Sequence, residues 1–275
     1  MARLFDWAAR PAERMVTVAS LREGKGRPAR HAQVTADTEE EAAAAEAAGI
    51  EMVVCRAGNV HTVRRGSLRV FITAALGFAE AVTDDEIMRT AFRALTDGAD
   101  AVITARRLSI VSLLASEDIP VMGHLGFVPR KSTWVGRTRA VGKTADEALS
   151  LWHRFRRLED AGAFAVEAEI IPDQLMTEFT ERSSLVTVSL GSGAGGDVIF
   201  LFASDICGET PAPRHARAFG DIASLREKIK IERATAFSAF RTHVASGTYP
   251  DETEVVTMPP DEWSKLSNCF EESEQ

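Results

Sequence analysis

A helix that ends at glycine and leads into a buried strand occurs three times in this chain, and this repeat restricts the fold more than any other feature. In the second unit, Thr83 is the expected N-cap, Glu86 follows three residues later as in a capping box, and Gly98 ends the helix before the strand Ala101–Thr104. Strands alternating with helices typically form a parallel sheet. The three units read EEEAAAAEAAGIEMVVC, TDDEIMRTAFRALTDGADAVIT and TADEALSLWHRFRRLEDAGAFAVEA.

Further strands extend this sheet and predict its closure. We expect them at Val121–Gly123, Leu185–Leu190 and Val198–Phe202, and no Pro/Gly/Ser-rich linker divides the chain. The predicted fold is therefore α/β, a (β/α)8 TIM-type barrel forming a single domain over residues 1–275. It comprises an N-terminal segment (1–33), a barrel core (about 34–220) and a C-terminal helix with an acidic tail (about 221–275). In such barrels the chemistry lies where the strands end.

Composition narrows the class of partner. The 275 residues are 45% hydrophobic and carry a formal net charge of −8 with no long basic run, which argues against nucleic acid or an anionic membrane as the partner. No apolar stretch is long enough to span a membrane, and the first residues do not resemble a secretory signal. Three widely spaced cysteines fit a reducing compartment, so a cytoplasmic protein that binds small molecules is expected.

Four motifs in a fixed order carry a family resemblance. They are IPVMGHLGFVPRK, LEDAGAFAVEAEIIP, LGSGAGGD and GETPAPRHARAFGDI. Over roughly residues 16–250 the chain resembles the ketopantoate hydroxymethyltransferase family (3-methyl-2-oxobutanoate hydroxymethyltransferases), within the phosphoenolpyruvate-binding TIM-barrel superfamily. The resemblance implies a homo-oligomer that acts on a 2-oxo acid. It also implies a magnesium ion that chelates this acid, and methylenetetrahydrofolate as the one-carbon donor.

Two residues of these motifs are the expected catalytic groups. The resemblance implies that Glu169 is the base that removes a proton beside the carbonyl. His124 closes a barrel strand and can donate to the carbonyl or enolate oxygen. The alternatives are that His124 is a core imidazole and that Glu169 pairs with Arg130 or Lys131.

The positions that hold magnesium in the family carry no carboxylate here. The resemblance places its two aspartates at Ala57 and Ala75 and its glutamate at Ala105. Magnesium needs hard oxygen ligands, so the usual magnesium site is not expected, and no other cofactor is predicted. Cys55 and His61 lie near the same loop and would suit a softer metal, but nothing in the sequence shows that they converge, so a buried thiol and a surface imidazole are expected instead.

Substrate binding is assigned to four residues near the strand ends. Arg56 and Arg106 flank two of the alanines, so their guanidinium groups are predicted to hold the substrate's carboxylate or an enolate oxygen in place of the metal. The alternative is that they point to solvent or pair with acids such as Glu51 or Asp84. Gly58 replaces the family's serine, and Ser192 lies in a glycine-rich loop whose N–H groups can hold an anion.

The connection between the second and third barrel strands is short. Only seventeen residues separate Ala57 from Ala75, so we expect an extended segment and a turn at residues 65–67 in place of the usual helix. One barrel helix is then missing, and a neighbouring subunit or the N-terminal segment covers the gap. An alignment shifted by several residues is the alternative.

Three functions remain open from the sequence. The first is aldol-type formation or cleavage of a carbon–carbon bond beside a 2-oxo acid carbonyl, without the usual magnesium. The second is a non-catalytic protein that binds a metabolite or a catalytic relative. The third is standard hydroxymethyl transfer to 3-methyl-2-oxobutanoate with altered metal ligands.

Overall fold

The computed structural model describes residues 4–28 and 30–273. The first three residues of the expected N-terminal segment and the last two of the expected acidic tail lie outside this part. The chain divides into two compact units, Met1–Gly220 and Asp221–Gln275. The functional residues expected from the sequence all belong to the first unit.

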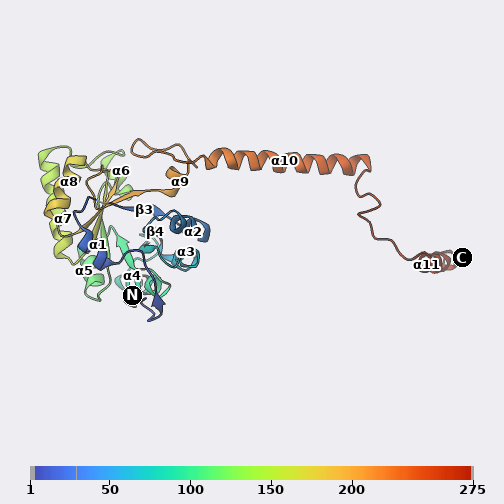
Figure 1. Ribbon diagram of the computed structural model, residues 1–275, viewed down its shortest axis with the longest axis horizontal. Helices are drawn as coiled ribbons and strands as arrows, with labels where there is room; N and C mark the ends of the chain where they lie inside the picture. Colours follow the sequence, from blue (N-terminus) through green and yellow to red (C-terminus); the bar gives the residue numbers. More distant parts are fainter. Residues whose placement is uncertain (1–3, 29, 274–275) are drawn as a thin grey trace. The chain divides into compact units, whose positions relative to one another are not determined.

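The first unit contains a closed barrel of eight parallel strands, which confirms the predicted fold (Figure 1). The strands follow the chain order from β3 to β10, and β10 closes the barrel by pairing with β3. Their bounds are β3 His31–Thr35, β4 Met52–Arg56, β5 Phe71–Ala75, β6 Ala101–Thr104, β7 Val121–Gly126, β8 Ala165–Glu169, β9 Val186–Leu190 and β10 Val198–Leu201.

The connecting helices begin and end largely as their caps predict. Thr38 with Glu41 and Thr83 with Glu86 form capping boxes at the starts of α2 and α4. Gly98 follows α4 at φ +111°, a backbone conformation that other residues rarely adopt. The helices are α2 Glu39–Ala47, α3 Val60–Gly66, α4 Asp84–Thr96, α5 Leu108–Ala115, α6 Ser132–Val135, α7 Ala145–Asp160, α8 Asp173–Arg182 and α9 Ala203–Ile206. In Figure 1, α7 and α8 lie side by side on the barrel.

The expected loss of a helix between the second and third barrel strands is wrong. A 3₁₀ turn at Ala57–Asn59 continues into α3, a helix of two turns. Val60 and Val63, one turn apart, are fully buried against the core, and Arg64 donates to the carbonyl oxygens of Gly98, Ser67 and Val70. A two-turn helix fits the short connection. Within residues 30–273, the connection between barrel strands that has no helix is 191–197, between β9 and β10.

The N-terminal segment packs against the inner cluster of apolar side chains. A short hairpin, β1 Leu4–Phe5 with β2 Pro11–Ala12, precedes helix α1 Val18–Gly24. Val16 and Leu21 are buried in the same apolar cluster as the inward-facing side chains of the strands. These two side chains therefore belong to the barrel's core, whereas the hairpin strands are largely exposed.

Two polar residues also face the barrel interior. Gln33 of β3 is in register with Met52, and Thr73 of β5 is in register with Val54. Met52 and Val54 belong to the inner apolar cluster, and paired residues of parallel strands share a face. Gln33 and Thr73 are therefore buried inward-facing polar groups.

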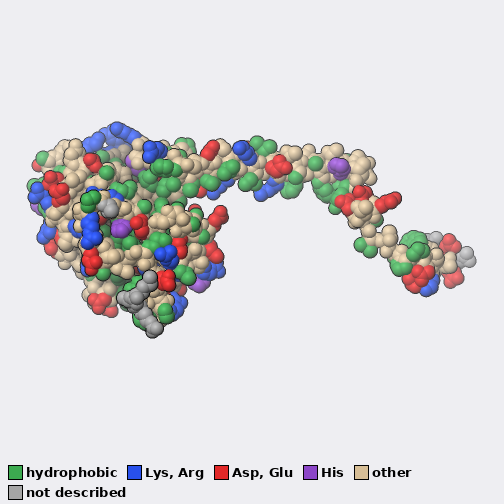
Figure 2. Space-filling model, viewed as in Figure 1, with side chains coloured by type: hydrophobic (Ala, Val, Ile, Leu, Met, Phe, Trp, Pro, Cys, Tyr) green, Lys and Arg blue, Asp and Glu red, His purple; other side chains and the backbone are tan. Residues whose placement is uncertain are grey.

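The second unit contains helices α10 Ile222–Ser246 and α11 Pro260–Ser273. Neither helix has a buried residue, and apolar side chains are visible along α10 in Figure 2. On the visible face of the first unit, Figure 2 shows basic and acidic side chains intermixed. No helix in the described part of the chain is long and apolar enough to cross a membrane.

Candidate active site

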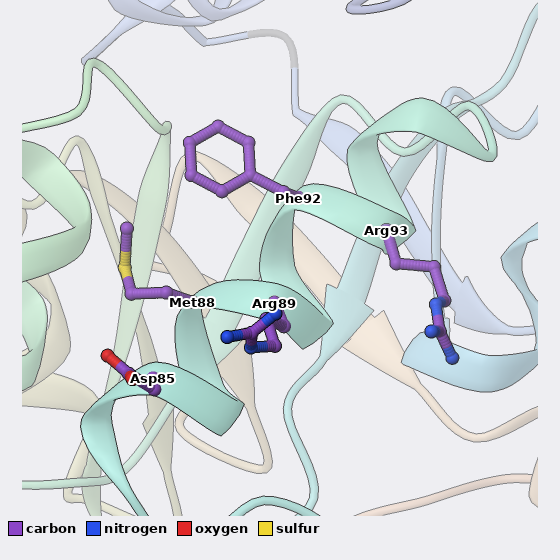
Figure 3. Close-up of a pocket in the computed structure, with 5 residues that line it drawn as sticks. All are labelled: Asp85, Met88, Arg89, Phe92 and Arg93. Atoms are coloured by element: carbon purple, nitrogen blue, oxygen red, sulfur yellow. The ribbon is translucent and has the colours of Figure 1, made fainter.

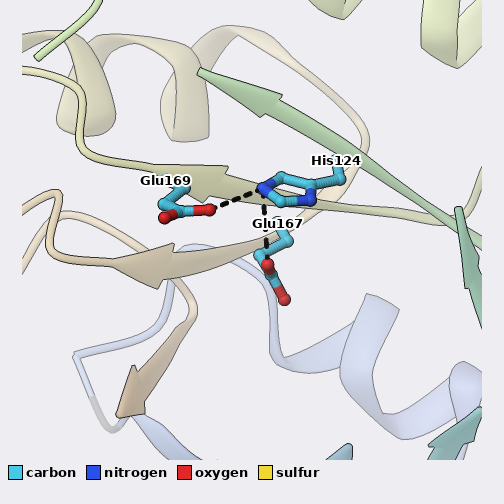
Figure 4. A group of neighbouring side chains, drawn as sticks. All are labelled: His124, Glu167 and Glu169. Atoms are coloured by element: carbon cyan, nitrogen blue, oxygen red, sulfur yellow. Dashed lines mark hydrogen bonds and ion pairs between the residues drawn. The ribbon is translucent and has the colours of Figure 1, made fainter. Parts of the chain in front are cut away.

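Three ionisable side chains meet inside the barrel near the carboxyl ends of β7 and β8 (Figure 4). His124 Nε2 lies 2.9 Å from Glu169 Oε2 and 3.6 Å from Glu167 Oε1. The strand register explains the convergence, because His124 pairs with Glu167 and Gly126 pairs with Glu169. The structure thus brings together the two residues expected to be catalytic, and it adds a third.

Glu167 is the member of this cluster that sequence reasoning missed. Its signal lies in the strand AVEAE, where two acidic residues stand two positions apart. Side chains two apart in a strand point to the same side, so the pattern places both carboxylates inside the barrel. Both residues are buried, with 5% and 8% of their surface exposed.

The backbone around Glu169 is strained and closely packed. Ile170, the next residue, has φ +50°, which is unusual for a β-branched side chain and is found mainly at functional sites. Gly126 approaches so closely that a Cβ there would lie 2.3 Å from the carbonyl oxygen of Glu169. That oxygen accepts a hydrogen bond of 2.7 Å from the Phe127 N–H. The strand end therefore holds Glu169 in one position.

Ser192, in the glycine-rich loop, fixes the backbone turn that follows Glu169. Its hydroxyl accepts from the Ile171 N–H at 3.0 Å and donates to the Ala168 carbonyl oxygen at 2.8 Å. These two bonds lie on either side of Glu169 and Ile170. Since both partners are backbone groups, the structure supports a positioning role for the side chain predicted to bind substrate.

Replacing Ser192 with alanine is expected to slow turnover about ten- to a hundredfold while substrate affinity stays nearly unchanged. The change leaves the Ile171 N–H without its buried acceptor and frees the strained turn to move Glu169. Steady-state kinetics separating kcat from KM, with a melting curve, measure the effect. Thr180→Val is the control, since it removes a buried hydroxyl that bonds Thr187 instead of this turn. Equal losses of kcat in both variants would contradict the positioning role.

The electrostatics of the cluster favour a charged His124. Burial alone lowers the pKa of its imidazole, but the hydrogen bond to Glu169 and the charges of both glutamates outweigh it, so the pKa is raised. Burial raises the pKa of Glu167 to about 7; the charge of His124 opposes this rise and that of Glu169 adds to it. The cluster can therefore hold or move a proton near neutral pH.

The other predicted binding residues lie at the end of β4, in the turn after it and in the loop after β6. Arg56 ends β4 with 76% of its side chain exposed, and its closest acid is Asp37, at 3.9 Å. Arg106 donates to the carbonyl oxygens of Gly77, Phe78 and Ala81 in the loop after β5. Gly58 lies in the 3₁₀ turn after β4, with open space where a Cβ would be. No hydrogen bond or ion pair links these three to His124 in the described part of the chain.

The three positions that the resemblance assigns to magnesium carry alanine, whose methyl side chain does not fit that ion because it offers no oxygen. Ala57 follows β4, Ala75 ends β5 and Ala105 follows β6. The carbonyl oxygen of Ala105 already accepts a hydrogen bond from Arg130. Within the described residues, neither Cys55 nor His61 joins a group of possible metal ligands. Cys55 is buried, which raises the pKa of its thiol to about 12, and His61 is exposed.

A separate hollow on the outer face of α4 does not belong to this site. It is lined by side chains of a single helix (Figure 3): Asp85, Met88, Arg89, Phe92 and Arg93. It contains none of the cluster residues.

Fold and site together define a class: a (β/α)8-barrel protein with an acid–base cluster at the carboxyl ends of its strands. A solved structure of a candidate phosphonomutase from Burkholderia cenocepacia J2315 aligns with a TM-score of 0.51 at 12% identity, covering 80% of this chain and 99% of that one. At this identity the likeness supports the fold alone.

The family follows from the sequence comparisons. The profile of the ketopantoate hydroxymethyltransferase family matches residues 55–252. A 3-methyl-2-oxobutanoate hydroxymethyltransferase of Gluconacetobacter diazotrophicus is 32% identical, covering 77% of this chain and 76% of that protein. The enzyme of that name from Hyperthermus butylicus is 33% identical, with coverages of 76% and 72%. The chain belongs to the ketopantoate hydroxymethyltransferase family, a family of transferases, which confirms the resemblance. A homo-oligomer remains a prediction.

Proposed function

We propose that this protein forms or cleaves a carbon–carbon bond beside the carbonyl of a 2-oxo acid, through an enolate and without the family's magnesium ligands. The observation that carries the proposal is the 2.9 Å contact between His124 and Glu169 at the barrel's strand ends. A base and a positively charged donor next to each other are what enolate formation requires.

Each group has a defined part in the reaction. Glu169 accepts the proton from the carbon beside the carbonyl, and the electrons of that C–H bond form the carbon–carbon double bond of the enolate. The carbonyl π electrons move to oxygen, where the positive charge of His124 stabilises them. Methylenetetrahydrofolate, the one-carbon donor that we propose, reacts with water to give formaldehyde and tetrahydrofolate. The enolate carbon then attacks the formaldehyde carbon, the C=O π electrons move to oxygen, and that oxygen takes the proton held by Glu169.

The relatives' names suggest 3-methyl-2-oxobutanoate as the substrate. We place its carboxylate against Arg56 at the barrel rim, since that guanidinium is exposed and its ion pair with Asp37 is long. Arg106 is less suited, because one of its nitrogens already donates to three loop carbonyls.

Titration calorimetry with a panel of 2-oxo acids tests the site. We expect 3-methyl-2-oxobutanoate to bind, and Arg56→Ala to weaken its binding about ten- to a hundredfold by removing a charge-assisted contact. Added magnesium should leave the affinity unchanged, because Ala57, Ala75 and Ala105 offer it no ligands.

Two controls accompany this titration. Arg107→Ala removes an exposed guanidinium that pairs with Asp84, and it should bind like the wild type. 3-Methylbutanoate lacks the 2-oxo group and should not bind. Equal heats from 3-methylbutanoate and 3-methyl-2-oxobutanoate, or no binding of any 2-oxo acid, would contradict the proposal.

A further inference from the structure

The cluster of His124, Glu167 and Glu169 has the geometry of a metal site. Each side chain offers one ligand atom, and the three atoms all lie within 4.8 Å of one another. Ligand atoms about 2.0–2.2 Å from a metal ion lie roughly 3 to 3.5 Å from each other. The distances of 2.9 and 3.6 Å from His124 Nε2 already match this spacing. An ion therefore fits between the three side chains after small rotations.

The donor set selects the class of ion. Two carboxylates and one imidazole are a mixed oxygen and nitrogen set, which suits divalent first-row transition metals such as Mn²⁺, Fe²⁺ and Zn²⁺. Magnesium prefers oxygen ligands alone and keeps several waters. The cluster is thus suited to a different ion from the family's three alanine positions.

Burial supplies an independent reason for a cation here. The Glu167 side chain is 7% exposed, and the one interaction it makes within the described residues is the 3.6 Å approach to His124. When both carboxylates are ionised, their charge exceeds what one protonated imidazole can balance, and buried charge without compensation is costly. A divalent ion bound to two carboxylates and a neutral imidazole balances this charge.

Polar groups without a hydrogen-bond partner inside the barrel also support a bound polar species there. The amide nitrogen and oxygen of Gln33 and the hydroxyl of Thr73 are buried and have no hydrogen-bond partner within the described residues. Both side chains face the barrel interior, as Glu167 does. Buried polar atoms are normally paired, so the interior is built for a polar occupant.

We propose that His124, Glu167 and Glu169 bind one divalent first-row transition-metal ion, in place of the magnesium site that the alanines at positions 57, 75 and 105 exclude. Three protein ligands leave positions open to the two oxygens of a 2-oxo acid. Glu169 needs to give the ion one oxygen, so the other stays free to accept the substrate proton. With the ion bound, His124 is a neutral ligand, and the ion supplies the positive charge at the enolate oxygen that the proposed function assigns to the protonated imidazole. The inference therefore deepens the proposed function and rests on it for the substrate.

Metal titration of the full-length protein tests the site without any substrate. The protein is stripped with a chelator and titrated with Co²⁺, followed by visible absorption, and with Zn²⁺, Mn²⁺ and Mg²⁺ by calorimetry. We expect one transition-metal ion per chain, weak or no Mg²⁺ binding, and a higher melting temperature with Zn²⁺. Glu167→Gln should weaken binding by at least about a hundredfold, since even supporting groups around a metal cost 10–100-fold.

Matched variants locate the ion. His61→Ala and Cys55→Ser remove the other two candidate ligands near the strand ends and should bind metal like the wild type. His124→Asn provides a second test of the cluster, and melting curves of all variants verify folding. Absence of transition-metal binding, or equal binding by wild type, Glu167→Gln and His124→Asn, overturns the proposal. Because the titration contains no 2-oxo acid, it leaves the test of 2-oxo acid binding independent.

Discussion

Replacing Glu169 with glutamine is expected to slow proton exchange at carbon 3 of 3-methyl-2-oxobutanoate by about 10²–10⁴-fold, the usual contribution of a positioned base. Glutamine keeps the shape of the side chain but cannot accept the proton. The exchange of this proton for deuterium, followed by proton NMR in heavy water, measures the step directly and needs no one-carbon donor.

The control for this variant is Glu178→Gln, which changes an exposed carboxylate of α8 that pairs with Arg182. It should exchange the proton at the wild-type rate. Calorimetry on Glu169→Gln should still detect substrate binding, because the variant removes the base and leaves Arg56 in place. Wild-type exchange rates in Glu169→Gln would show that another group is the base.

Replacing Asp100 with asparagine is expected to lower the free energy of unfolding by about 3–5 kcal/mol, the cost of leaving buried charges without their partner. Asp100 accepts from Arg14 at 2.6 Å and from Arg64 at 2.9 Å, and both guanidinium side chains are nearly buried. Burial lowers the pKa of Arg64 to about 10, and the charge of Asp100 opposes this decrease. Urea unfolding measures the loss.

The control for Asp100→Asn is a matched substitution in an exposed ion pair. Asp84 pairs with Arg107 on the surface, with about half of each side chain exposed, so Asp84→Asn should cost less than about 1 kcal/mol. A similar loss in both variants would show that the two buried arginines do not depend on Asp100. The large loss expected for Asp100 would show that this carboxylate fastens the N-terminal segment and α3 to the barrel.

Much of the barrel could be predicted from local signals. The capping threonines Thr38, Thr83 and Thr144 mark the starts of three helices, and each bonds the backbone N–H three residues on. Such signals act over a few residues, so a single sequence contains them in full. Closure of the sheet was predicted from the further strands and from the lack of a linker that would divide the chain.

The helix α3 shows where local signals fail. Its seven residues include β-branched Val60 and Val63 and end at Gly66, a composition equally compatible with an extended segment and a turn. What stabilises it is tertiary: both valines are fully buried, and Arg64 reaches carbonyl groups distant in the sequence. Such contacts cannot be inferred from the segment itself.

The site was predictable where a motif marked it. The family motifs pointed to His124 and Glu169, whose contact the structure contains. Glu167 lies in the same motif as Glu169, but its place in the cluster depends on the register of β7 with β8, which the sequence does not specify. The direction in which the Arg106 side chain points could not be predicted either, because the carbonyl groups that it bonds lie in the loop after a neighbouring strand.

Deuterium exchange by the wild-type protein shows whether the cluster of His124, Glu167 and Glu169 enolises a 2-oxo acid. We expect the protein, without added magnesium, to accelerate loss of the carbon 3 proton signal of 3-methyl-2-oxobutanoate or another 2-oxo acid in the panel. We also expect His124→Asn and Glu169→Gln each to abolish most of this acceleration. If 2-oxo acids bind but the wild-type protein exchanges their protons no faster than buffer alone, the cluster does not enolise them. The chain is then a protein that binds 2-oxo acids without catalysing this reaction.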